Sequence, residues 1–205
     1  PATLTSIFLG PAERVDVLVD FSGHVPGDLI RLQSRPFSLG GPPSMQGQPM
    51  DLMRFSVTDR EVQPASAPSS LVALPPTPDL EGAPRQTFEF RSHMMRHSIN
   101  GVTFDMERVD AQIPLGEPQV WTFSNTGAIP HPVHAHGGQF RVLSRSGGRG
   151  QVFPWERGLK DTVLLMALET VEVAVHFPEH RGLFLLHCHN LEHEDEGMMI
   201  NFEVV

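Results

Sequence analysis

The amino-acid sequence predicts an all-β protein assembled from many short strands. Apolar and polar residues alternate with a period of two, as on strands that bury one face, and no long segment has the spacing of an amphipathic helix. The alternation is clearest in Arg14–Phe21 and Thr170–Phe177. Glycines and prolines separate such segments along the chain, which is typical of a β-sandwich.

Several further segments repeat this alternation, and we expect each of them to form a strand. In chain order they are Leu29–Gln33, Met53–Val57, Thr87–Arg91, Val120–Ser124, Phe140–Ser144, Thr162–Met166 and Leu183–His189. A tight hairpin turn is predicted at Asn100–Gly101, between Ser98–Ile99 and Val102–Phe104, because both turn residues tolerate a positive φ.

The segment 63–84 differs from its surroundings in composition. Its prolines are interspersed with alanine and serine, at Pro64, Pro68, Pro75, Pro76, Pro78 and Pro84. This composition predicts an extended linker. Residues 85–205 are then expected to form a complete sandwich, and residues 1–62 only the C-terminal part of an earlier β domain. The opening residues look cut from a longer polypeptide, so we expect the remaining strands of that domain upstream.

The composition argues against several classes of partner and of site. The formal net charge of −9 weighs against nucleic acid or anionic lipid as a partner, because either would favour a basic surface. No run approaches the roughly 18 apolar residues that a membrane span requires. Cys188 is the only cysteine, so an internal disulfide is impossible, and such a residue is ordinarily a small buried apolar side chain.

Two short segments concentrate the side chains that bind metals. Residues 131–137 read His-Pro-Val-His-Ala-His-Gly, and residues 187–198 begin His-Cys-His and continue to His193 and Met198. Together they hold six of the 11 histidines and the single cysteine. One His-x-His pair alone is more often structural than a ligand pair, but chance does not readily produce this clustering.

Strand alternation divides the second segment between two sites. Successive side chains on a strand face opposite sides, so His187 and His189 share one face while Cys188 points to the other. A loop after the strand can return His193 and Met198 to the Cys188 sulfur. One thiolate, two imidazoles and a weak thioether are the ligands of a blue-copper electron-transfer site.

The first segment supplies the remaining imidazoles. His134 and His136 share a strand face, whereas His131 lies off that register and precedes a proline that fixes the chain direction. His131 is therefore the candidate for the second imidazole of the blue-copper site. The pair His134 and His136 converges with His187 and His189 on an all-imidazole site, which suits copper and would also suit zinc.

These motifs resemble the two C-terminal copper motifs of multicopper oxidases. The stretches HSINGVTFDM, HPVHAHGGQFRVLSRSG, KDTV and HCHNLEHEDEGMM are similar to bacterial laccases and to cuprous oxidases of the copper-efflux type. The resemblance is close over Arg96–Val205 and looser over LGPAERVDVLVDF, which looks like the end of the family's middle domain. It implies a cupredoxin-like Greek-key sandwich, preceded by part of a second cupredoxin domain.

The resemblance also implies a role for each ligand and four coppers in the complete enzyme. The implied type 1 ligands are His131, Cys188 and His193 with Met198 axial, the type 2 ligand is His134, and the type 3 ligands are His136, His187 and His189. In the family a reducing substrate, such as a small phenol or a metal ion, gives single electrons to type 1 copper. They pass through Cys188 and its flanking histidines to a trinuclear copper cluster, where dioxygen becomes water.

The resemblance implies that this chain carries only half of the cluster's ligands. It implies that an N-terminal cupredoxin domain supplies the others, on the same gene or as a separate chain, and that the enzyme is periplasmic or secreted. Dioxygen reduction consumes protons, and the resemblance favours Glu194 over Asp195 or Glu196 as a proton relay. The candidate catalytic residues are therefore Cys188, His187, His189 and Glu194; three acids on a solvated loop are the alternative interpretation.

The sequence departs from the efflux-type oxidases in two ways. Residues 63–84 contain no methionine, which weighs against cuprous ion as the principal substrate. Gly127 stands four residues before His131, where those oxidases often carry an acid, so one expected supporting carboxylate is missing. Two other functions stay open. A blue-copper electron-transfer protein without oxidase activity would need only His131, Cys188, His193 and Met198. The other is a structural zinc or copper-storage module. The single thiolate and the axial methionine weigh against it, and a structural zinc site would be closed by four ligands, whereas eight candidates are present here.

Overall fold

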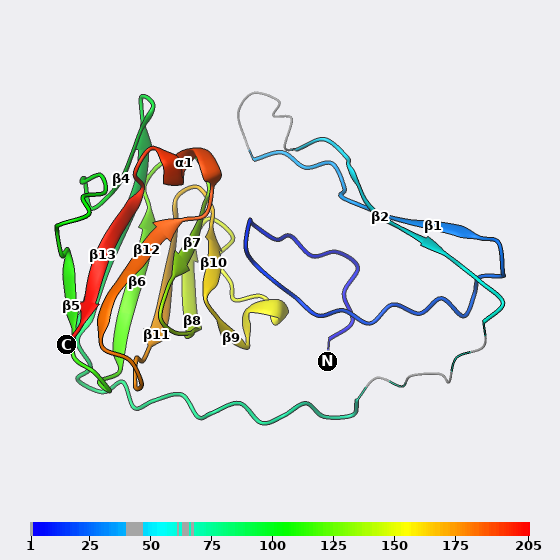
Figure 1. The fold of residues 1–205 in the computed structure, drawn as a ribbon, viewed down its shortest axis with the longest axis horizontal. Helices are drawn as coiled ribbons and strands as arrows, with labels where there is room; N and C mark the ends of the chain where they lie inside the picture. Colours follow the sequence, from blue (N-terminus) through cyan, green and yellow to red (C-terminus); the bar gives the residue numbers. More distant parts are fainter. Residues whose placement is uncertain (1, 40–46, 61, 63–65, 67) are drawn as a thin grey trace. The chain divides into compact units, whose positions relative to one another are not determined.

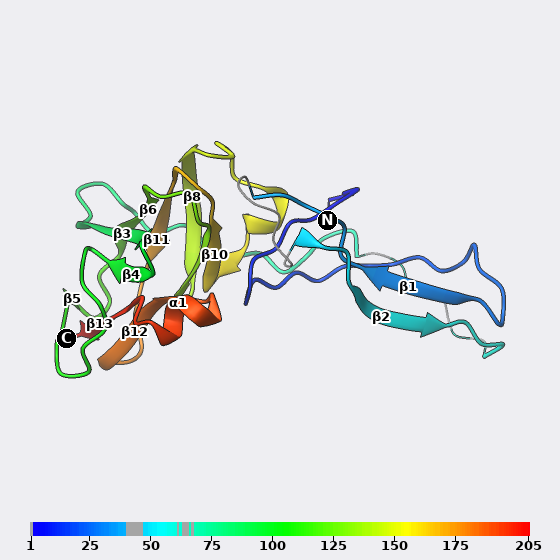
Figure 2. The same ribbon diagram turned by 90° about the horizontal axis from the view of Figure 1, so that it is seen from above.

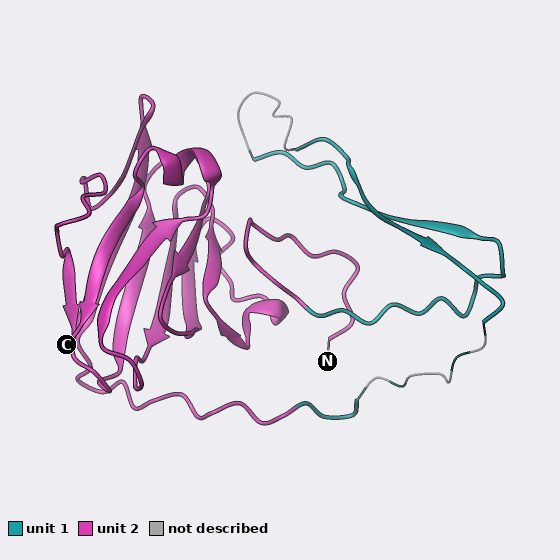
Figure 3. Ribbon diagram, viewed as in Figure 1, with its two compact units in different colours: residues 1, 16–71 teal, residues 2–15, 72–205 magenta. Residues whose placement is uncertain are grey.

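The computed structural model describes residues 2–39, 47–60, 62, 66 and 68–205. Within them the chain forms two compact units, one of residues 16–71 and one of residues 2–15 with 72–205 (Figure 3). Residues 2–15 thus belong with the C-terminal unit. Part of the predicted linker at 63–84 lies outside the described residues, and the domain boundaries at 62 and 85 stay a prediction.

The larger unit is almost entirely β-structure (Figure 1). Its strands are β3 (Arg85–His93), β4 (Arg96–Ile99), β5 (Ala111–Ile113), β6 (Gln119–Asn125), β7 (His131–Ala135), β8 (Phe140–Gly147), β9 (Leu159–Lys160), β10 (Thr162–Leu165), β11 (Glu169–Val175), β12 (Gly182–Cys188) and β13 (Met199–Val204). One short helix, α1 (Leu191–Asp195), follows β12. Among the described residues, no helix has the length and hydropathy needed to cross a membrane.

The strands of this unit form two sheets. One has the order β10-β7-β12-β13-β5, and the other has the order β4-β3-β6-β11-β8-β9. Figure 2 shows them as two layers, with β12 and β13 in one and β3, β6 and β11 in the other. The all-β sandwich predicted from the sequence is therefore confirmed.

Aromatic side chains fill the space between the two sheets. Trp121 of β6 lies with its ring centroid 5.0 Å from that of Phe88 and 5.2 Å from that of Phe202 on the opposite sheet. Its indole nitrogen donates to Gln119 Oε1 at 3.1 Å, which satisfies the one polar atom of the ring. Burial of each such ring stabilises the fold by roughly 1.5–3 kcal/mol relative to an exposed one.

A buried ion network supports the sandwich beside β8 and β11. The guanidinium of Arg145 is fully buried and donates to the carboxylates of Glu156 and Glu169. Glu169 Oε2 also accepts the backbone N–H of Met166 at 2.8 Å, just beyond the end of β10. Because a buried charge without its partner is costly, each member requires the others.

The smaller unit contains one antiparallel strand pair. β1 (Leu29–Gln33) and β2 (Asp51–Ser56) pair with Leu29 opposite Ser56 and Ile30 opposite Phe55. The predicted strand at Leu29–Gln33 is confirmed, and the one predicted at Met53–Val57 is shifted by one to two residues at its ends.

The strand predicted at Arg14–Phe21 is wrong. No strand among the described residues pairs with it, and its alternating Val17 and Val19 are each 60% exposed. Alternation shows that a segment could bury one face of a sheet, but a strand also needs a neighbour for its backbone hydrogen bonds.

Most strand predictions in the larger unit are confirmed, and so is the tight turn. Asn100 and Gly101 adopt φ of 52° and 79°, and Ile99 and Val102 exchange two backbone hydrogen bonds across them. The second arm is only an isolated bridge at Val102. The Asn100 side chain also accepts the N–H of Glu89 at 2.7 Å, which ties the turn to β3.

Candidate metal centres

One strand, β12, places neighbouring residues on opposite faces of the five-stranded sheet. It lies between β7 and β13, with Leu186 opposite Ala135 and His187 opposite His134. Cys188 ends the strand and is fully buried in the core between the sheets. His187 therefore points to the outer face of this sheet, as strand alternation predicts.

Three side chains meet on the inner face and form a group that we call the sulfur site, consisting of His131, Cys188 and His193. The sulfur lies 3.6 Å from His131 Nδ1 and 3.4 Å from His193 Nδ1, and the two nitrogens are 3.1 Å apart. His131 comes from β7, Cys188 from β12 and His193 from α1. The three donors are 0%, 0% and 7% exposed, in that order.

Burial sets the protonation states in the sulfur site. It lowers the pKa of His131 to about 3 and that of His193 to about 4, with smaller contributions from neighbouring histidines. It raises the pKa of the Cys188 thiol to about 12. Two neutral imidazoles and a buried thiol converge there, and a cation among them would favour the thiolate. The donor set therefore fits a metal ion.

Met198 is held beside this group by its backbone. Its N–H donates to His193 O at 2.8 Å, and its carbonyl accepts from Cys188 N at 3.0 Å. Its side chain is fully buried in the same core cluster as Cys188. Gly197 makes the preceding turn with φ of 83°, where an added Cβ would also lie 3.3 Å from Phe104 N. A side chain at Gly197 would therefore disturb the turn that carries Met198.

His97 also lies at the sulfur site, and the sequence analysis did not predict it. Its ring stacks on that of His193, with centroids 4.1 Å apart and an interplanar angle of 23°. Ser92 Oγ lies 2.7 Å from His97 Nδ1 and holds the ring in place. The contact depends on how the β3–β4 hairpin meets α1, and no residue spacing encodes that arrangement.

Four histidines gather on the outer face and form the imidazole site. His136 Nε2 lies 3.1 Å from His187 Nε2, and both of these rings lie close to His134, with centroids 4.8 and 5.3 Å away. The His189 ring is 5.3 Å from that of His187 and 5.6 Å from that of His134. All four residues of the predicted all-imidazole group are thus neighbours.

Backbone carbonyls orient two of these rings. His134 Nδ1 lies 2.9 Å from Asp161 O and 3.0 Å from Thr162 Oγ1, and His187 Nδ1 lies 3.0 Å from Cys188 O. A ring whose Nδ1–H donates in this way presents the lone pair of Nε2. Burial lowers the pKa of both His136 and His187. Neutral imidazole rings gathered in this way, with the Nε2 atoms of His136 and His187 3.1 Å apart, are suitable metal ligands.

Comparison with known proteins adds the family to this geometry. Residues 74–205 match the family model described as multicopper oxidase. The chain belongs to the multicopper oxidase family. It is 37% identical to the bilirubin oxidase of Albifimbria verrucaria and 35% identical to a laccase of Haloferax volcanii, each over 98% of this chain.

Solved multicopper oxidases share the fold. The structure superimposes on McoA of Aquifex aeolicus with a TM-score of 0.78 and 32% identity, over 91% of this chain and 42% of that one. A laccase of Pediococcus acidilactici gives a TM-score of 0.77 and 33% identity, over 91% of this chain and 38% of that one. The cupredoxin-like fold class is therefore confirmed.

Copper is the cofactor of multicopper oxidases, and the donors of both sites suit it. The chain spans 36% of the bilirubin oxidase and 35% of the Haloferax laccase. It is therefore one portion of the length found in these relatives. The copper type assigned to each histidine, and the axial role of Met198, stay predictions.

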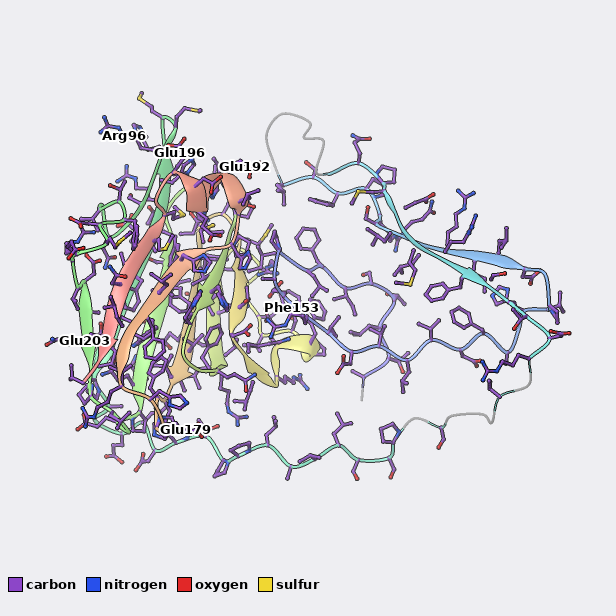
Figure 4. All side chains as sticks on the ribbon, viewed as in Figure 1. Arg96, Phe153, Glu179, Glu192, Glu196 and Glu203 are labelled. Atoms are coloured by element: carbon purple, nitrogen blue, oxygen red, sulfur yellow. The ribbon has the colours of Figure 1, made fainter. Side chains whose placement is uncertain are left out.

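Among the acids after His193, Glu194 is distinguished by its position. Its Oε2 lies 3.5 Å from His187 Nδ1, and its side chain is 32% exposed. Asp195 and Glu196 are exposed, and Figure 4 labels Glu192 of α1 and Glu196, the residue that follows α1, at the same end of the larger unit. Of the three predicted candidates, Glu194 alone has a described contact with an imidazole-site histidine.

Proposed function

We propose that the complete protein is a laccase-like oxidase that couples one-electron oxidation of a small phenol or metal ion to the four-electron reduction of dioxygen to water. The observation that carries this proposal is the division of β12 between two sites. Cys188 contributes to the sulfur site while His187, the residue before it, contributes to the imidazole site. Such adjacency suits a protein that must receive electrons at one place and use them at another.

When bound, copper supplies the one-electron redox chemistry of both sites. The chain's own residues provide the connection between them. The path from Cys188 Sγ to the His187 ring runs through one peptide unit, and the contact between His187 Nδ1 and Cys188 O, at 3.0 Å, shortens it. His189 offers a second covalent path to the same face.

Dioxygen reduction consumes four electrons and four protons for each pair of water molecules formed. Glu194 lies where a carboxylate could carry protons from solvent, because it is partly exposed and its Oε2 is 3.5 Å from His187 Nδ1. We assign it the role of proton relay.

A second cupredoxin domain is required by this proposal. His134, His136, His187 and His189 offer four protein ligands, too few for the three coppers that oxygen reduction in this family implies. The remaining histidines, His24, His93, His97, His176 and His180, do not form a further His-x-His pair. An N-terminal domain with two more such pairs, on the same gene or a companion chain, would complete the cluster. The greater length of the relatives supports this. We extend the proposal to a periplasmic or secreted location.

Spectroscopy and oxygen uptake of the full-length protein test the proposal. We expect an intense blue absorption band, copper signals from a second site, and oxygen consumption with a phenol or an oxidisable metal ion. His136→Ala should keep the blue band and lose oxygen consumption. His180→Ala is the matched control, since that side chain is 73% exposed. A blue wild-type protein that consumes no oxygen with any donor would instead be an electron-transfer protein.

A further inference from the structure

The leading segment of the larger unit makes a specific contact with the start of β10. Arg14 donates from Nη2 to Asp161 Oδ2 at 2.8 Å and from Nη1 to Asp161 Oδ1, so the ion pair is bidentate. Lys160 Nζ donates to the carbonyl of Arg14 at 3.0 Å. The two chain segments are thus joined in both directions, although they lie 147 residues apart in sequence.

Asp161 lies at the junction of the two sheets. β9 ends at Lys160 in the six-stranded sheet, and β10 begins at Thr162 in the five-stranded sheet, so Asp161 is the single residue between these two strands. Its carbonyl accepts the backbone N–H of Ala135 at 3.1 Å, at the end of β7. Its carboxylate pairs with Arg14, which comes from a segment outside both sheets.

The same residue orients an imidazole-site ligand. The carbonyl of Asp161 lies 2.9 Å from His134 Nδ1, and Thr162 Oγ1 lies 3.0 Å from the same nitrogen. The Thr162 hydroxyl donates in turn to Asp161 Oδ1 at 3.0 Å, so its lone pair can accept the ring N–H. The carboxylate held by Arg14 therefore orients the Thr162 hydroxyl and belongs to the same residue as the carbonyl acceptor, which the N–H of Ala135 also holds.

Glu13 anchors the segment at a second point. Its Oε1 accepts the N–H of Leu164 at 3.1 Å, and its Oε2 accepts the N–H of Gly10 at 2.8 Å. Gly10 allows a close approach, since an added Cβ would meet Leu164 Cδ1 at 3.0 Å and Pro132 Cγ at 3.4 Å. The segment thus packs against β10 and against the residue next to His131.

We propose that Arg14 is a positioning residue for His134. Its bidentate ion pair holds Asp161, the residue at the junction of the two sheets, in the position that orients the His134 ring. The proposal rests on the function proposed above, in which His134 is a copper ligand. Partners of a ligand's second ring nitrogen typically change metal affinity by about 10- to 100-fold when they are disturbed. Arg14 acts on His134 only through Asp161, so we expect about a tenfold loss of copper affinity at the imidazole site when the Arg14–Asp161 ion pair is removed.

A role of Arg14 in surface stability alone predicts a different experimental result. The Arg14 side chain is 64% exposed, and ion pairs as exposed as this one add little to global stability. Arg85 offers a matched control, because its side chain is 62% exposed and pairs with Glu172 on the six-stranded sheet. If Arg14 serves only the surface, Arg14→Met and Arg85→Met should behave alike.

The experiment compares the two variants in the full-length protein. Arg14→Met should alter the type 2 copper resonance and weaken copper binding there about tenfold, with the blue band of the sulfur site unchanged. Arg14→Lys keeps the charge but loses the bidentate ion pair, so its copper affinity and resonance should lie between those of wild type and Arg14→Met. Arg85→Met should match wild type in both measurements.

A metal-free readout separates this proposal from the function on which it rests. In the copper-free protein, the His134 Nδ1–H should exchange slowly with solvent in wild type and Arg85→Met, and faster in Arg14→Met. Equal exchange in the two variants, or equal copper resonances, would overturn the positioning role. A wild-type protein without a type 2 signal would overturn the proposed function instead, and the exchange rates would then decide the role of Arg14 alone.

Discussion

The sulfur site and the imidazole site differ in how far this chain encloses them. His131 and Cys188 are completely buried and His193 is 7% exposed, so the sulfur site is closed by the sandwich itself. His134, His136 and His189 all keep contact with solvent. The sulfur site holds its three donors in the closed core, whereas the imidazole site has an open side where further ligands could enter. This contrast supports the proposed second domain.

Replacement of Cys188 should have the largest effect. Cys188→Ser removes the thiolate of the sulfur site, so the blue absorption should vanish and substrate oxidation should stop. The imidazole site should still bind copper, because none of its rings is changed. Visible and copper-resonance spectra of the full-length variant measure the two sites separately. A Cys188→Ser protein that stayed blue would remove this residue from the site.

Replacement of Glu194 tests the imidazole site, the more open of the two. Glu194→Gln keeps the size of the side chain but cannot accept a proton, so turnover with dioxygen should fall by about 100-fold. Anaerobic reduction of the sulfur site by substrate should keep its rate. Glu196→Gln is the control, since Glu196 follows α1 and is exposed (Figure 4). Equal turnover in the two variants would favour acids on a solvated loop.

The enclosed site should make the metal-free protein sensitive to acid. In the unfolded chain His131 and His193 titrate near 6.5, whereas in the folded chain their pKa values are about 3 and about 4. Between pH 6.5 and 4 the unfolded state binds protons that the folded state does not. Stability should therefore fall with decreasing pH, by up to ~1.4 kcal/mol per pH unit for each histidine.

Urea unfolding of the copper-free protein at several pH values measures this slope. His131→Phe removes one buried titrating group and should flatten the dependence, whereas His180→Asn changes an exposed ring and should leave it as it is. A slope that is the same in wild type and His131→Phe would contradict the expected role of burial.

Met198 should give the smallest effect. Met198→Leu conserves volume in the core, so the free energy of unfolding should change by less than ~1.5 kcal/mol. Copper should remain bound, and the reduction potential of the sulfur site should rise, because the oxidised ion loses a weak donor. Redox titration measures the potential, with Met106→Leu, an exposed methionine, as control. Loss of the copper or an unchanged potential would argue against an axial role.

Features that follow a short-range rule could be predicted from the sequence. Strand alternation was enough to separate Cys188 from His187, and the φ preferences of Asn100 and Gly101 were enough to predict their turn. Features that depend on a long-range contact could not be predicted. The alternating Arg14–Phe21 lacks a partner strand among the described residues, and the stacking of His97 on His193 joins segments that no spacing relates.

The ion pair between Arg14 and Asp161 is another long-range contact of this kind. Arg14 lies in a stretch that resembles the end of a different domain, so no residue spacing or motif relates it to His134. The buried network around Arg145 was missed as well, because charged residues at these positions are indistinguishable from surface charges until the fold shows their burial.

The use of adjacent β12 residues by both centres has a consequence for how such chains can change over generations. A single inserted or deleted residue within 186–189 would turn every following side chain to the opposite face of the sheet. It would exchange the occupants of the two centres in one event, and no compensating substitution nearby could restore both. Gains and losses of length must therefore accumulate elsewhere, in exposed connections such as the loop at 178–181 between β11 and β12. Substitutions can change the residues around His187 and Cys188, but these two residues must stay adjacent in the sequence.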